Sequence, residues 1–170
     1  SILNTEETSL HRGNLASVVQ HSANIMTKIF ENVAEGIMIT DESKRIIKVN
    51  PAFEFVTGYK EEEVIGQYPN VLQSGVHEKD FYLTMWESLY TTGMWQGEIW
   101  NRRKTGDIYP EWLTIMSIKD DTGNITNYCG IFTDLSERKL VEDELEKSML
   151  RDTLTDVCNR FAYLERMNAL

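Results

Sequence analysis

Five short segments rich in β-branched and aromatic residues constrain the fold of this 170-residue chain more than any other feature. Two come early, GIMITD at 36–41 and RIIKVN at 45–50, and the turn-like ESK separates them. Such a pair predicts a β-hairpin. Three longer segments follow at 94–104, 107–119 and 124–134, joined by TG and DDTG, which suit tight antiparallel turns. The sequence therefore predicts an antiparallel sheet built from two separate parts of the chain.

The stretch between these two groups of strands predicts helices. NPAFEFVTG at 50–58 combines an asparagine that can cap a helix, a proline suited to its first position and a glycine that can end it. At 77–92, apolar residues recur at every fourth position, which predicts the longest helix of the core. Two strands, several helices and three strands make a mixed α+β domain.

Amphipathic helices are predicted on both sides of this domain. From 14 to 33, apolar residues follow the spacing of one helix face, as expected for a helix that packs either on its own domain or on a second copy. From 135 to 151, Val141, Leu145 and Met149 lie four apart among strong helix formers. Only one small core precedes this stripe, so we expect a second copy to cover it. The sequence predicts a parallel homodimer through the flanking helices.

Charge and composition exclude several classes of function. The chain has 17 Lys and Arg against 27 Asp and Glu, and its net charge of −10 opposes binding to nucleic acid or to anionic membrane surfaces. No apolar run approaches about 18–20 residues, the length that spans a bilayer. Cys129 and Cys158 lie in no metal-binding spacing, so no metal site is predicted and a reducing cytoplasm is expected. A membrane anchor elsewhere in a longer parent protein would be compatible with this chain.

Three longer stretches resemble the PAS domains of bacterial sensor proteins. They are NPAFEFVTGYKEEEVIGQ at 50–67, GMWQGEIWNRRKTGDIYPEW at 93–112 and NYCGIFTDLSERK at 127–139. The resemblance implies an α+β PAS fold, in which a five-stranded antiparallel sheet of order 2-1-5-4-3 cups a pocket against short helices. It also implies four parts: an N-terminal helix region at 1–26, the PAS domain at 27–134, a signalling helix at 135–151 and the start of another domain at 152–170.

The resemblance places five side chains in the pocket. They are Trp86, Asn101, Glu111, Tyr128 and Phe132. In the light-sensing LOV subgroup of PAS domains, a cysteine forms an adduct with flavin, but Pro69 stands at that place here. Glu111 and Phe132 stand where LOV domains present an asparagine and a glutamine to the flavin. LOV photochemistry is therefore not expected.

The identity of the ligand stays open at this point. Trp86 and Asn101 also match a PAS subgroup that binds flavin adenine dinucleotide (FAD) as a redox sensor, so bound FAD is one alternative. A pocket filled by its own side chains or by a small metabolite is favoured over FAD. Haem is not expected, because His77 opens the long helix at an exposed capping position and His11 and His21 lie in or before the N-terminal helix.

The end of the chain resembles the start of an enzyme domain. DTLTDVCNR at 152–160 is similar to D-x-L-T-x-L-x-N-R, with which GGDEF domains begin, and these domains condense two GTP molecules into cyclic di-GMP. The matching residues are Asp152, Leu154, Thr155, Asn159 and Arg160. None is expected to be catalytic, because phosphoryl transfer needs Mg²⁺-binding carboxylates and a nucleotide-binding loop, which lie further on in GGDEF proteins.

The resemblance thus implies a cytoplasmic sensory PAS domain that controls a diguanylate cyclase. Two alternatives stay open. The PAS domain could serve only for dimerisation, or a degenerate GGDEF domain could drive an attached phosphodiesterase.

Overall fold

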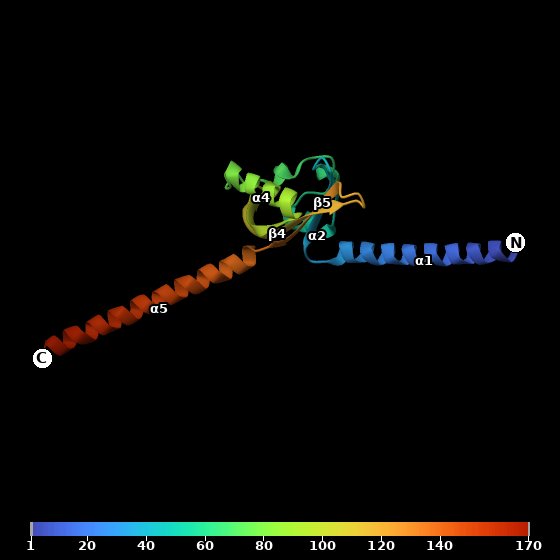
Figure 1. The fold of residues 1–170 in the computed structure, drawn as a ribbon. Coiled ribbons are helices and arrows are strands. Elements are labelled where there is room, and N and C mark those ends of the chain that lie inside the picture. Colours follow the sequence, from blue (N-terminus) through green and yellow to red (C-terminus); the bar gives the residue numbers. More distant parts are fainter. Residues whose placement is uncertain (1, 170) are drawn as a thin grey trace. The chain divides into compact units, whose positions relative to one another are not determined.

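The computed structural model describes residues 2–169, which fall into two compact units divided between Asp134 and Leu135. The first unit contains α1 (Ile2–Asn32), β1 (Gly36–Asp41), β2 (Ile46–Val49), α2 (Pro51–Thr57), α3 (Glu61–Val64), the 3₁₀ turn η1 (Pro69–Leu72), α4 (Lys79–Thr92), β3 (Met94–Arg102), β4 (Ile108–Lys119) and β5 (Ile125–Asp134) (Figure 1). The second unit is the single helix α5 (Ser136–Asn168).

The five strands form one antiparallel sheet in the order β2-β1-β5-β4-β3, which confirms the predicted fold and strand order. The paired strands that lie furthest apart in the sequence are β1 and β5, in which Gly36 lies opposite Phe132. The hairpin between β1 and β2 turns tightly at Lys44, whose φ is 70°. Asp41 supports this turn, because its Oδ1 accepts two backbone N–H groups from the residues that follow.

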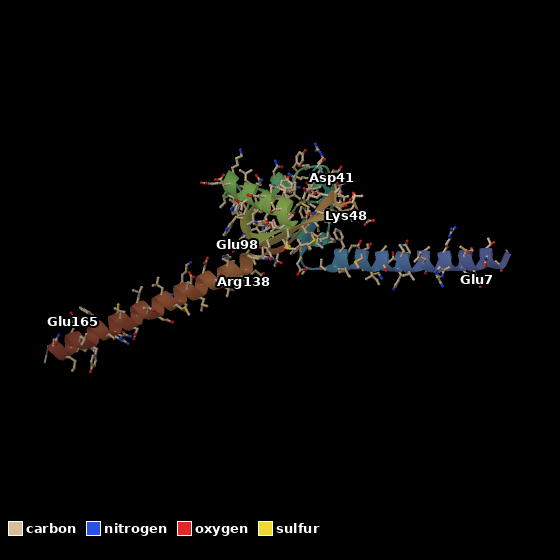
Figure 2. All side chains as sticks on the ribbon, in the orientation of Figure 1. Glu7, Asp41, Lys48, Glu98, Arg138 and Glu165 are labelled. Carbon is tan, nitrogen blue, oxygen red and sulfur yellow. The ribbon has the colours of Figure 1, made fainter. Side chains whose placement is uncertain are left out.

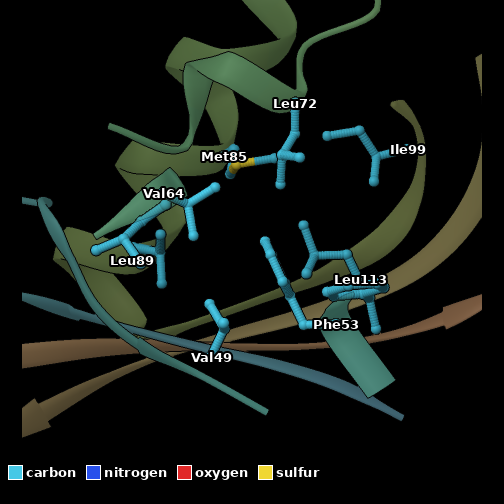
Figure 3. Close-up of a cluster of buried hydrophobic side chains, with 10 residues drawn as sticks. Val49, Phe53, Val64, Leu72, Met85, Leu89, Ile99 and Leu113 are labelled. Carbon is cyan, nitrogen blue, oxygen red and sulfur yellow. The ribbon is translucent and has the colours of Figure 1, made fainter. Parts of the chain in front are cut away.

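Short helices pack against one face of the sheet and close the core. As predicted, Asn50 caps α2, because its Oδ1 accepts the N–H of Phe53 at 2.9 Å, and Gly58 ends the helix with a φ of 79°. Figure 3 shows the buried apolar cluster between these helices and the sheet. It consists of Ile46, Val49, Phe53, Val64, Leu72, Met85, Leu89, Ile99, Leu113 and Phe132.

Asn50 also joins three segments of the first unit. Its Nδ2 donates to the carbonyl oxygens of Phe30 at 3.1 Å and Glu35 at 2.9 Å, and its Oδ1 accepts the N–H of Ile37 at 2.8 Å. The side chain is 1% exposed, so these bonds are shielded from water. The end of α1 is therefore fixed to the start of β1 and to α2.

Both flanking helices are longer than the apolar patterns predicted. α1 begins at Ile2 instead of near residue 14, and α5 continues past residue 151 to Asn168. Neither helix contains proline, so nothing in the backbone ends them where the apolar stripe ends. The expected divisions at 26/27 and 151/152 fall inside continuous helices, and they stay predictions about function.

The apolar side chains of α5 lie on the surface of the second unit. Val141, Leu145 and Met149 are 65%, 56% and 61% exposed, and Figure 2 shows side chains projecting from both visible edges of the helix. None of the helices between residues 2 and 169 is both long enough and apolar enough to cross a membrane.

Candidate functional site

A cavity of about 240 Å³ lies between the inner face of the sheet and the segments η1 and α4. All five residues that the sequence placed in the pocket line it. They are Trp86 from α4, Asn101 from β3, Glu111 from β4, and Tyr128 and Phe132 from β5. The pocket is therefore not completely filled by its own side chains, and space for a ligand is present.

Strand alternation decides which side chains reach the cavity. On β3, Asn101 lines it and the neighbouring Trp100 does not. On β5, Tyr128 and Phe132 line it, whereas Cys129 between them does not. The thiol of Cys129 thus belongs to the other face of the sheet and is out of reach of a ligand in the cavity.

A buried hydrogen-bond network around Glu111 forms part of the cavity wall. Glu111 is 2% exposed; Nδ2 of Asn101 donates to its Oε1 at 2.7 Å, and the hydroxyl of Tyr109 donates to its Oε2 at 2.8 Å. Burial raises the pKa of Glu111 to about 7, against the opposing effect of these two hydrogen bonds. The charge of Glu111 therefore changes near neutral pH.

The network continues from the cavity to the end of β5. The guanidinium of Arg103 lies 3.9 Å from the ring centroid of Tyr109, and its Nη2 pairs with Oδ2 of Asp134 at 2.7 Å. Nη1 of Arg103 donates to the carbonyl oxygen of Val56 at 2.6 Å. Glu111 and Asp134 are also opposite each other in the pairing of β4 with β5. These contacts connect the cavity to the residue at which the sheet ends.

Lys44 lines the cavity from the turn between β1 and β2. Its Nζ donates to the hydroxyl of Tyr90 at 2.8 Å and lies 3.9 Å from the ring centroid of Trp86. Trp86 in turn packs edge-on against Tyr128 at 5.4 Å. A left-handed backbone is uncommon for a lysine, and these two contacts hold the side chain in place.

Tyr82 lines the cavity, and its hydroxyl is buried and has no hydrogen-bond partner among the described residues. Burial raises the pKa of this hydroxyl, so it stays protonated. Leaving such a group without a partner is unfavourable by about 1–3 kcal/mol. Our sequence analysis missed Tyr82, although Tyr82, Met85, Trp86 and Leu89 have the spacing of one helix face.

His77 is not the exposed capping residue that the sequence predicted. The helix begins two residues later, and His77 is half-buried, with its Nε2 accepting the backbone N–H of Trp100 at 2.8 Å and its ring stacked on Phe81 at 4.0 Å. The prediction was wrong because this bond joins the helix entrance to a strand far along the chain, which no local pattern reveals. His77 does not line the cavity.

A family model described as the PAS domain matches residues 34–137, more than half of the chain. The chain belongs to the PAS family. A solved PAS domain from Colwellia psychrerythraea has a similar structure, with a TM-score of 0.64 and 26% identity over 68% of this chain and 98% of that chain. The cavity described above is thus the interior pocket of a PAS domain.

Two relatives indicate the kinds of protein in which similar PAS domains occur. The nitrogen fixation regulatory protein of Klebsiella oxytoca is 29% identical over 130 residues, which are 76% of this chain and 26% of that protein. The blue-light photoreceptor of Listeria innocua is 30% identical over 128 residues, which are 74% of this chain and 50% of that protein. This PAS chain therefore spans a quarter to a half of the length of these curated relatives.

The wall of this PAS cavity does not fit a LOV-type flavin adduct. Pro69 lines it at the place that the LOV resemblance gives to the cysteine, and no cysteine lines it. Phe132 offers no hydrogen bond. The volume of about 240 Å³ lies below the ~300–1,000 Å³ typical of ligand pockets, which favours a small ligand. Within residues 2–169, no three His, Cys, Asp or Glu side chains come together in a way that could hold a metal ion.

The residues of the GGDEF-like motif lie along α5, in the second unit of the PAS chain. They are Asp152, Leu154, Thr155, Asn159 and Arg160, all exposed. Nε of Arg160 pairs with Oδ2 of Asp156, one helical turn earlier, at 3.5 Å. This pair is on the helix surface and is worth a few tenths of a kcal/mol.

Proposed function

We propose that this PAS domain is a sensory module that binds a small ligand in its cavity and regulates a GGDEF-type diguanylate cyclase through α5. The observation that carries the proposal is the continuity of α5, which runs from Ser136 to Asn168 and includes the GGDEF-like motif. The helix contains neither proline nor glycine, so a rotation at its start is transmitted along it.

Two apolar stripes on different faces support a change of partner along α5. The first consists of Val141, Leu145 and Met149. The second consists of Leu150, Leu154, Val157, Phe161 and Leu164. At 3.6 residues per turn, the second stripe is centred about 140° around the helix from the first. We assign the first stripe to pairing with a second copy, because it lies next to the PAS domain. The second stripe, whose spacing of four and three residues would also suit a coiled coil, is assigned to the core of the domain that the motif opens, because it overlaps the motif.

Dimerisation matters for this output because one cyclic di-GMP is made from two GTP molecules. Two GGDEF active sites must meet, and their meeting depends on how two α5 helices pack. A ligand that changes the charge of Glu111 would change the electrostatic field at Arg103 and Asp134, just before α5 begins. If two α5 helices can pack in two arrangements, a ligand shifts the balance between them only by the difference in its affinity for the two.

A cavity-filling variant tests this function in the protein that contains the chain. Gly130 lines the cavity, and a Cβ at this position would meet Leu113 at 3.6 Å, an ordinary contact, so Gly130→Leu should fill space without breaking the sheet. The rate of cyclic di-GMP formation from GTP should change at least about fivefold. Ile118→Phe, at a position that is 41% exposed on β4, is the control.

Two results would contradict the proposal in different ways. An unchanged rate in the Gly130→Leu variant would contradict the sensory role of the cavity and leave a dimerisation module. No formation of cyclic di-GMP by the unaltered protein would contradict the GGDEF output, and would leave a degenerate domain attached to a phosphodiesterase.

A second candidate function is flavin-based sensing without a covalent adduct. It is favoured by the 30% identity to the Listeria blue-light photoreceptor and by the position of Asn101 and Trp86 in the cavity wall. An ultraviolet-visible spectrum of the freshly purified chain distinguishes the two candidates. A flavin absorption band would support this alternative, and a spectrum without visible absorption supports a colourless small ligand.

A further inference from the structure

Glu111 presents a carboxyl group to the cavity with part of its hydrogen-bonding capacity unused. An ionised carboxylate has about four lone-pair sites. The amide of Asn101 and the hydroxyl of Tyr109 each donate one hydrogen bond to it. A donor that enters the cavity would therefore find acceptor sites on a group that water reaches poorly, where a charge-assisted hydrogen bond is strong.

Tyr82 is a second, independent sign of a ligand in the same cavity. Its buried hydroxyl lacks a partner among the described residues. Since a tyrosine hydroxyl can donate or accept, a polar group of a ligand would satisfy it once a small shift of the Tyr82 side chain opens the hydroxyl to the cavity. The remaining wall is mostly apolar and aromatic, with Met85, Trp86 and Phe132 among its members. Such a wall suits a ring with polar substituents.

Lys44 is the competing feature, since its ammonium group could instead attract an anion. This group is already held by the hydroxyl of Tyr90 and the ring of Trp86. Glu111 has no comparable cationic partner among its hydrogen bonds. The net charge of −10 also opposes the approach of anions.

We propose that the cavity selects a small, one-ring molecule that is neutral or cationic and donates an N–H hydrogen bond to Glu111, with Tyr82 as its second polar contact. This proposal deepens the sensory function above and rests on it for its biological meaning. The cavity volume of about 240 Å³ corresponds to about eight water molecules at ~30 Å³ each, which is the size of a substituted six-membered ring.

The charge of Glu111 links binding to pH. Three titratable or charged groups act directly on Glu111: Tyr109 on β4, Arg103 after β3 and Asp134 on β5. Four others line the same cavity, namely Lys44, Tyr68, Tyr82 and Tyr128. Burial gives Glu111 a pKa of about 7, so a cationic donor binds the ionised form and displaces a proton from the fraction that is protonated.

Three ring compounds of nearly equal shape and different charge test the proposal on the 170-residue chain. They are benzamidine, a cation; benzamide, a neutral donor; and benzoate, an anion. Calorimetry at pH 8 should give an affinity for benzamidine at least about tenfold higher than for benzoate, with benzamide between them.

Between pH 8 and pH 6, the ionised fraction of Glu111 falls about tenfold, and the affinity for benzamidine should fall with it. Repeating the titration at pH 7 in buffers of different ionisation enthalpy should show release of about half a proton.

Two isosteric variants assign the effect to named atoms. Glu111→Gln should abolish the preference for benzamidine over benzamide and remove the proton release. Tyr82→Phe should weaken the binding of benzamide about fivefold, as expected for one lost hydrogen bond. Circular dichroism of each variant verifies that the fold is intact.

Several outcomes would overturn the proposal. Benzoate binding as tightly as benzamidine would mean that Lys44 governs selection. Absence of binding by all three compounds, or an unchanged preference in Glu111→Gln, would also contradict it, and unchanged affinity in Tyr82→Phe would remove Tyr82 from the site. Because these measurements need no output domain, the binding preference can hold even if the proposed control of cyclic di-GMP fails.

Discussion

At the scale of the residue, Glu111 links the stability of the first unit to pH. Its pKa rises from an ordinary value of 4.5 to about 7 because it is buried, so the folded state holds the proton more tightly than the unfolded chain does. The stabilisation of the folded state by this bound proton is fully present below about pH 4.5 and is lost as the pH rises through 7. At about 1.4 kcal/mol per pKa unit, ionised Glu111 destabilises the fold by on the order of 3 kcal/mol at pH 8.

We therefore expect Glu111→Gln to gain stability relative to the unaltered chain as the pH rises. The difference between their free energies of unfolding should shift by about 2.5 kcal/mol between pH 5 and pH 8, measured by urea denaturation. Glu87→Gln, on the exposed face of α4, is the matched control and should show little shift. A constant difference across this range would mean that Glu111 titrates like an exposed carboxyl.

His77 gives a dependence on pH of the opposite sign. Burial lowers its pKa below the ordinary 6.5, and its Nε2 can accept the N–H of Trp100 only when it is unprotonated. The contribution of His77 to the stability of the fold is present above pH 6.5 and is lost as the pH falls below that value.

His77→Ala should lower the free energy of unfolding by about 1–2 kcal/mol at pH 8 and by less at pH 5.5. His21→Ala, exposed on α1, should change it by less than about 0.5 kcal/mol, and an equal loss in both variants would contradict this role.

At the scale of the element, the sequence predicted what depends on local chemistry. The cap of α2 and the hairpin of β1 and β2 follow from residues within a few positions of each other, and both were predicted. The order of the strands came from resemblance to a family, because pairing of β1 with β5 joins segments about 90 residues apart and no local rule specifies it. The length of α5 was underestimated because the resemblance at 152–160 placed the start of another domain there, although the apolar spacing of α5 continues to Leu164. The length of α1 was underestimated because its first turns carry few apolar residues.

The first apolar stripe of α5 supports a prediction about assembly. Val141→Lys together with Leu145→Lys places two charges in the proposed helix pair, so the dimer should dissociate and the mass from light scattering should halve. Leu154→Lys with Val157→Lys changes the second stripe and should leave the dimer intact. Unchanged mass in the first variant, or equal dissociation in both, would contradict the assignment of the first stripe to dimerisation.

At the scale of the whole molecule, the sequence identified residues that line the site, but not the free space and the contacts that they form. The five candidate residues were placed by resemblance to a family, and all five line the cavity. The free space, the contacts of Lys44 and the partnerless hydroxyl of Tyr82 depend on how side chains from six elements pack together. The route through Tyr109, Arg103 and Asp134 likewise requires the pairing of three strands. Such properties are cooperative and have no signature in a single segment.

The two stripes of α5 lead to a test of how the sensory domain and its output communicate. One alanine inserted between Met149 and Leu150 keeps each stripe intact and rotates the second by about 100° against the first. Seven inserted residues, a copy of 143–149, add nearly two complete turns of a paired helix and restore the relative orientation. If the packing of α5 sets how two GGDEF domains meet, the single insertion should lower cyclic di-GMP formation at least about tenfold, and the longer insertion should restore most of it.

The decisive measurement is the rate of cyclic di-GMP formation by the full-length protein with no insertion, one residue and seven residues. Both insertion variants lengthen α5, so a loss caused only by distance should grow with length and be greater for seven residues. A loss caused by rotation should be greater for one. Equal rates in all three proteins would mean that α5 acts as a passive tether, and the route from Glu111 to Asp134 would then have to influence the output without the rotation of this helix.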